Sequence, residues 1–65
     1  MKEFQVTKIL SEPRKMPLRL DDNFIIEYWS VAVVLEGNGE KYESAVTFET
    51  WEKAQKLKLG DVFLR

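Results

Sequence analysis

The chain has 65 residues, contains neither cysteine nor histidine, and carries a net charge of −1 at pH 7. A chain of this length forms one domain, residues 1–65, and without cysteine it cannot use disulfides or thiolate metal sites to supplement its core. The lack of histidine removes the commonest general base and the commonest metal ligand, so we expect a protein that is not an enzyme and holds no metal or cofactor.

Hydropathy indicates where the protein resides. The longest apolar run, residues 31–35, is far shorter than the roughly 20 residues that a membrane span needs. No signal-peptide pattern is visible at the N-terminus. We therefore expect a cytoplasmic protein with no membrane contact.

The first third of the chain contains one clear strand. Residues 2–10 alternate Phe4 and Val6 with polar side chains, which is the period of a strand with one buried face. Two prolines then interrupt residues 11–17, which we interpret as a positively charged loop. Residues 18–20 form at most a brief strand, and the short polar side chains of residues 21–23 predict a turn.

The middle of the chain predicts a long strand and a hairpin. Residues 24–36 are rich in β-branched and aromatic side chains on both parities, a pattern typical of a bent strand that serves two halves of a barrel. Glycines and asparagine at residues 37–39 predict a hairpin turn before the alternating residues 41–48. Tyr28 and Trp29 are adjacent, so they point to opposite faces, and we expect Trp29 to be buried.

A short helix and a last strand end the chain. The hydroxyl of Thr50 can cap a helix of about two turns. We expect Trp51 to plug a barrel opening from that helix. Gly60 can end the following turn in a left-handed conformation, and Val62 to Leu64 then form a strand.

Residues 24–65 resemble the ending of small SH3-like or OB-like barrels of uncharacterised bacterial and phage proteins. The resemblance rests on three segments, residues 46–48, 50–53 and 57–62. It implies a mainly β fold, a small closed barrel of about five strands with one short helix before the last strand, which returns beside the first. It transfers no catalytic or binding residue.

Charge is distributed unevenly along the chain. Residues 1–20 hold five basic and two acidic side chains, residues 21–50 hold one basic and seven acidic, and residues 51–65 hold four basic and two acidic. If the barrel closes, the two basic ends become neighbours and the acidic central hairpin lies opposite. We therefore expect an electrically two-sided molecule, which suits docking to a partner of complementary charge.

The best candidates for contact with a partner are Arg14, Lys15, Arg19 and Tyr28. The three basic side chains can hold an anionic partner, and Tyr28 with Ile26 can form a partner surface or a platform for base stacking. The alternative is a solvated basic loop, with Tyr28 in the core or covered by the helix. The spacing of the acidic residues matches no calcium-binding loop, so a solvated face is favoured over a metal site. The serines have no histidine to act as a base.

These patterns predict a non-enzymatic interaction module that acts through a protein-binding surface. We expect such a module to be a small accessory or regulatory protein, and the resemblance adds that a phage or another mobile element encodes it. The alternative is a barrel that binds single-stranded nucleic acid, because a barrel with Tyr28 and three basic residues offers stacking and phosphate contacts. Either a monomer or a homodimer is compatible with the sequence, since strand ends can pair between subunits.

Overall fold

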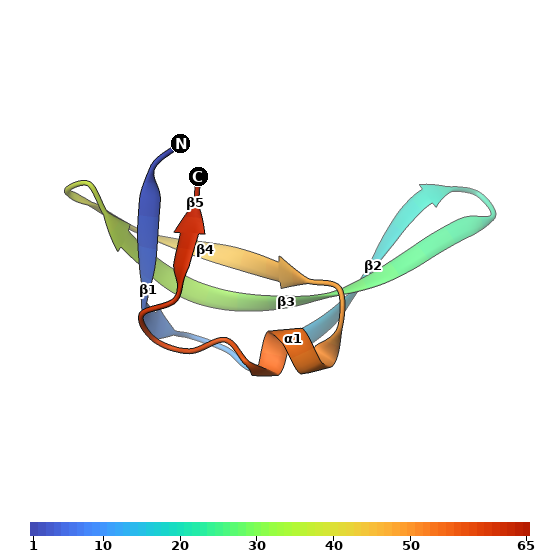
Figure 1. The fold of residues 1–65 in the computed structure, drawn as a ribbon. Coiled ribbons are helices and arrows are strands. Elements are labelled where there is room, and N and C mark those ends of the chain that lie inside the picture. The colour runs from blue at the N-terminus through green and yellow to red at the C-terminus, as the bar shows by residue number, and fades with distance from the viewer.

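The computed structural model describes residues 1–65, which form five strands and one helix. Their arrangement is drawn in Figure 1. In chain order they are β1 (Glu3–Ile9), β2 (Arg14–Asp21), β3 (Phe24–Gly37), β4 (Glu40–Phe48), α1 (Trp51–Gln55) and β5 (Val62–Leu64). The prediction of a mainly β chain of five strands with one short helix before the last is confirmed.

The long strand β3 is the central strand of a single sheet and pairs with three other strands. β4 pairs with one edge of β3, from Trp29↔Phe48 to Gly37↔Glu40. β1 and β2 follow one another along the other edge, β1 beside the C-terminal part of β3 and β2 beside its N-terminal part. β5 pairs with the outer edge of β1, so the chain ends beside its first strand, as predicted.

The sheet is not closed into a barrel. β5 pairs with β1 alone and β4 pairs with β3 alone, so both remain edge strands. The expectation of a closed barrel is therefore not confirmed, and the two halves of β3 pair with β1 and β2 within one open sheet.

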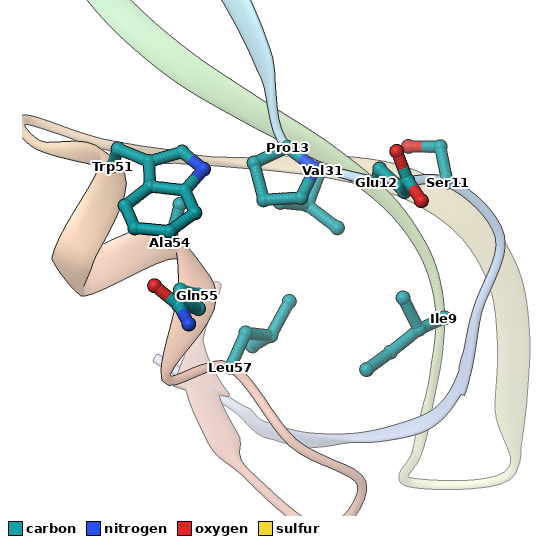
Figure 2. Close-up of a pocket in the computed structure, with 9 residues that line it drawn as sticks. All are labelled: Ile9, Ser11, Glu12, Pro13, Val31, Trp51, Ala54, Gln55 and Leu57. Atoms are coloured by element: carbon teal, nitrogen blue, oxygen red, sulfur yellow. The ribbon is translucent and has the colours of Figure 1, made fainter.

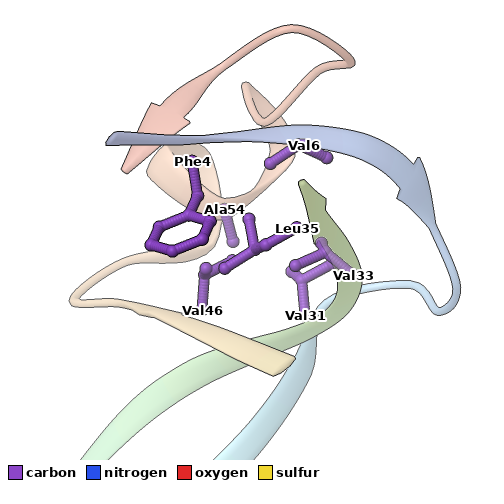
Figure 3. Close-up of a cluster of buried hydrophobic side chains, with 7 residues drawn as sticks. All are labelled: Phe4, Val6, Val31, Val33, Leu35, Val46 and Ala54. Carbon is purple, nitrogen blue, oxygen red and sulfur yellow. The ribbon is translucent and has the colours of Figure 1, made fainter. Parts of the chain in front are cut away.

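The core is small and lies in the half of the molecule that contains β1, β4, β5 and α1 (Figure 3). Val31, Val33 and Leu35 alternate along β3 and point to the same side, where the other buried side chains meet them. Those are Phe4 and Val6 from β1, Val46 from β4 and Ala54 from α1. Trp29, expected to be buried, is half-buried and packs against this cluster.

The predicted turns are confirmed by backbone geometry. Asn38 and Gly39 have positive φ angles of 52° and 78°, which suit the tight turn between β3 and β4. Gly60 has a φ of 92° where the chain leaves the helical turn toward β5. These residues are glycine or asparagine because other side chains rarely tolerate positive φ.

The helix begins at the predicted cap. The hydroxyl of Thr50 accepts a hydrogen bond from the backbone N–H of Lys53 at 3.3 Å. We expect Thr50→Ala to lower the free energy of unfolding by about 1 kcal/mol, because an amide of the first turn loses its partner. Urea denaturation measures this loss. Thr50→Ser keeps the hydroxyl and serves as the control, and an equal loss in both variants would contradict the capping role.

One part of the hairpin β2–β3 projects away from the rest of the molecule (Figure 1). Residues 16–28 lie beyond the last β3–β4 pair, Trp29↔Phe48, and here β3 pairs with β2 alone. We call this segment the arm. It explains the elongated shape, 43 × 23 × 15 Å.

Two sequence predictions about residues 11–20 are wrong. The loop covers only the segment between Ile9 and Arg14, and the strand that follows is eight residues long instead of three. Pro17 lies inside this strand, opposite Glu27. An edge strand can accept a proline because the missing N–H is not needed for pairing on the open side.

Trp51 does not plug an opening. It is 46% exposed, and the residue of α1 that enters the core is Ala54. A five-residue helix can lie close to the sheet only through a small side chain, so the larger Trp51 remains at the margin.

The acidic hairpin does not lie apart from the basic ends. The ammonium of Lys2 is 3.6 Å from the carboxylate of Glu40, and the side-chain amide of Asn38 donates to the carbonyl of Glu3 at 3.1 Å. Because β1 pairs with the C-terminal part of β3, the turn that follows β3 is brought to the start of β1. The predicted electrical two-sidedness is therefore wrong here.

Candidate functional site

The arm has one continuous apolar face. The strand register places Met16 opposite Tyr28 and Leu18 opposite Ile26, and residues opposite each other in a sheet point to the same side. Leu20 continues this alternation at the bulge before the turn, and Phe24 continues it after the turn. We call these six side chains the apolar face: Met16, Leu18, Leu20, Phe24, Ile26 and Tyr28.

The apolar face is open to solvent. Leu20 and Phe24, near the tip, are 57% and 53% exposed, and Leu18 in the middle is 44% exposed. Tyr28, at the base, is half-buried. β4 does not pair with β3 beyond Trp29, and the end of β4 meets the apolar face only at its base, where Thr47, Phe48 and Glu49 line a hollow with Ile26 and Tyr28.

The opposite face of the arm, called the polar face, carries charged side chains and one exposed apolar side chain, Ile25, which is 54% exposed. Lys15 forms a salt bridge there with Glu27, and Arg19 lies opposite Ile25. Both partners of the salt bridge are more than half exposed, so the pair contributes little to stability. This face therefore resembles an ordinary solvated strand surface.

The structure does not bring the four predicted contact residues into one site. Arg14 and Tyr28 lie on the side of the apolar face, whereas Lys15 and Arg19 lie on the polar side. Arg14 forms no salt bridge and stands at the base of the arm, opposite Ser30. Only Arg14 and Tyr28 can therefore act together with the apolar face.

Sequence reasoning missed the apolar face because it treated residues 11–17 as a loop. The signal was present: Met16, Leu18 and Leu20 alternate with Pro17 and Arg19. The sequence indicates a patch formed by Ile26 and Tyr28. It does not indicate how far the patch extends, because the neighbouring strand is predicted to be too short.

A hollow of about 310 Å³ lies at the base of the arm. The apolar side chains of Leu10, Met16 and Ala32 line it, together with Ser11, Arg14 and Ser30. Its shape is held by the chain itself, since the N–H of Ala32 donates to the hydroxyl of Ser11 at 3.0 Å and the N–H of Leu10 donates to the carbonyl of Ala32 at 2.8 Å. The hollow can receive an apolar side chain beside a cation.

A second hollow, of about 260 Å³, lies beside α1 (Figure 2). Its walls are the side chains of Ile9, Val31, Ala54 and Leu57, with Trp51 and Pro13 at the margin. Glu12 is its single ionisable group. A lone carboxylate beside apolar walls forms no acid–base pair within this hollow.

The chemistry of the remaining surface is limited. No group of three or more acidic side chains lies close enough together to hold a metal ion. No helix of the protein has the length and apolar character needed to cross a membrane. The arm and the hollow at its base are therefore the features from which a function can be argued.

Comparison of the chain with protein-family models, with curated proteins and with solved structures finds no match. The function has to be inferred from the geometry of this molecule alone.

Proposed function

We propose that this protein is a non-enzymatic interaction module that binds a protein through the apolar face of its arm. The observation that carries the proposal is a projecting two-stranded ribbon with apolar side chains exposed along one side. A two-stranded hairpin is marginally stable in water by itself, and contiguous apolar patches mark binding surfaces in soluble proteins. A partner that covers the face would both bury the patch and order the arm.

The polar features of the site suit a protein partner better than nucleic acid. Of the three basic side chains in β2, Lys15 is paired with Glu27 and lies with Arg19 on the face opposite Tyr28. A single-stranded nucleic acid would need cations and a stacking platform on one face. Only Arg14 stands beside the apolar face.

The remaining expectations rest on the sequence. A cytoplasmic role as a small accessory or regulatory protein follows from the composition and from the resemblance to bacterial and phage domains. The SH3-like or OB-like classification likewise stays a prediction and contributes no residue to the proposed site.

Photo-crosslinking in the cells that produce the protein tests the proposal. With a photoreactive residue in place of Leu18 we expect a defined protein adduct, because this position lies at the centre of the apolar face. The control places the same residue at Leu59, which is 62% exposed but lies outside the arm. A variant that carries Ile26→Lys as well as the photoreactive residue should give no adduct. The lysine lies directly across the arm from position 18, and its charge opposes burial of the apolar face in an interface.

Two results would contradict a protein partner. One is a Leu18 adduct yield no greater than that of Leu59. The other is binding of a labelled single-stranded oligonucleotide at low salt that weakens with added salt and disappears when Arg14, Lys15 and Arg19 are all changed to Ala.

A further inference from the structure

The molecule exposes more surface than a compact monomer of its size. Its accessible surface is 5064 Å², whereas a compact chain of 7.7 kDa should expose about 4,300 Å². Its radius of gyration is 13.1 Å, against about 10.8 Å expected for 65 residues. The excess of about 700 Å² is close to the roughly 800 Å² that each partner buries in a standard interface.

Charge is arranged along the arm with opposite signs at its two ends. Arg14 stands at the base, and Asp21 and Asp22 form the tip. The two ends are about 26 Å apart at the rise of an extended strand, so they cannot interact within one chain. The uncharged pair Leu18 and Ile26 forms the middle of the apolar face, and Glu49 lies at the margin of the face, where it lines a hollow with Ile26 and Tyr28.

This pattern is complementary to itself. If two arms lie antiparallel with their apolar faces together, the acidic tip of each meets the basic base of the other. A two-fold axis through Leu18 aligns the tip of each arm with the base of the other. The two tip-to-base contacts then form together, as a closed dimer requires. The side chains near the tip, Leu20 and Phe24, then meet Met16 and Tyr28 of the second copy.

The hollow at the base of the arm fits the same arrangement. It opens on the side of the apolar face, since Arg14, Met16 and Ser30 share that side. A cavity of about 150 Å³ already accommodates benzene. At about 310 Å³ this hollow has room for the ring of Phe24 from a second copy, with Arg14 at its margin to meet Asp22.

We propose that the occupant of the apolar face is the same face of a second copy, in an antiparallel two-fold dimer centred on Leu18. The inference rests on the proposed function and names its partner. The dimer is proposed to form through the faces of the arms, and Pro17 makes the edge of β2 a poor template for another strand. The ion pairs fix the register and the apolar side chains supply the affinity.

Sedimentation velocity over a range of protein concentrations measures the dimer Kd. The test compares variants in which the charges of Arg14 and Asp22 are reversed, first singly and then together. Arg14→Glu and Asp22→Arg should each raise the dimer Kd about tenfold, because each creates two symmetry-related like-charge contacts. Asp22 is the residue to substitute because the carboxylate of Asp21 has a structural role. It accepts a hydrogen bond from the backbone N–H of Asn23 and stabilises the turn. The double variant should return to within about twofold of the wild-type Kd, since it restores opposite charges in the reversed sense.

Two further variants complete the experiment. Leu18→Lys should abolish the dimer, because two lysines would meet at the axis. Arg19→Glu, on the polar face of the same arm, should leave the Kd unchanged and is the matched control. Circular dichroism of every variant checks that the exposed substitutions leave the fold intact.

The proposal is overturned if the protein sediments as a monomer at all concentrations, or if the double charge exchange fails to restore the Kd. A monomer whose Leu18 crosslinks to a different protein would overturn the dimer and keep the proposed function. A monomer with no protein adduct at Leu18 would overturn both.

Discussion

Leu35→Ala should lower the free energy of unfolding by about 2–5 kcal/mol, because it removes a large side chain from the centre of a small core. Leu35 is fully buried and is the largest of the completely buried side chains. Its removal leaves a cavity among Phe4, Val33 and Val46, which come from three different strands. A domain of fewer than about 70 residues seldom has more than 3–5 kcal/mol of stability from its core, so the variant should be largely unfolded at room temperature.

Thermal and urea denaturation, followed by circular dichroism at one fixed protein concentration, measure this effect. The concentration must be held constant because association would stabilise the folded state. Leu59→Ala is the control: Leu59 is 62% exposed, and its truncation should change stability by no more than about 0.5 kcal/mol. Similar losses in the two variants would show that the buried cluster is not the source of stability.

Gly37→Ala should destabilise the protein by about 1–3 kcal/mol through a backbone collision. A Cβ at this position would overlap the carbonyl oxygen of Glu3 and lie 3.1 Å from the ring of Phe4 and 3.2 Å from its Cα. A carbonyl in a paired strand cannot move aside as a flexible side chain can, so β1 must shift away from β3.

Gly39→Ala separates this collision from the general cost of replacing a glycine. No atom lies within 4 Å of the Cβ that it would add, but its φ of +78° makes the alanine strained. Amide hydrogen exchange distinguishes the two variants. Gly37→Ala should reduce the protection of β1 amides selectively, whereas Gly39→Ala should leave β1 protected relative to the rest of the sheet. Equal loss of protection in β1 would contradict the close approach at Gly37.

The small core and the projecting arm have a common consequence. Only seven of the 65 residues are buried, and none of them belongs to residues 16–28. The arm is therefore the part of the molecule with the least stability of its own, and it is also the part with the most apolar surface to bury. Both properties are typical of a segment that becomes ordered in an interface.

The amino-acid sequence by itself determined the local elements. Alternation in residues 2–10 and 41–48, the residues of positive φ at 38, 39 and 60, and the hydroxyl of Thr50 each predict an element that the structure confirms. These signals are reliable because they depend on the backbone of a few neighbouring residues, and no distant contact can readily reverse them.

Only the tertiary structure decided how the strands meet, and this determines the candidate site. Met16 and Leu18 pair with Tyr28 and Ile26 across a short turn, but whether another element covers this hairpin depends on which strands β3 accepts along each edge. The pairing of β1 with β3 brings Glu40 to Lys2, Trp51 stays at the margin of the core, and the sheet remains open. Strand pairing and burial are long-range properties, so the chain reveals its apolar face only when its strands are assembled.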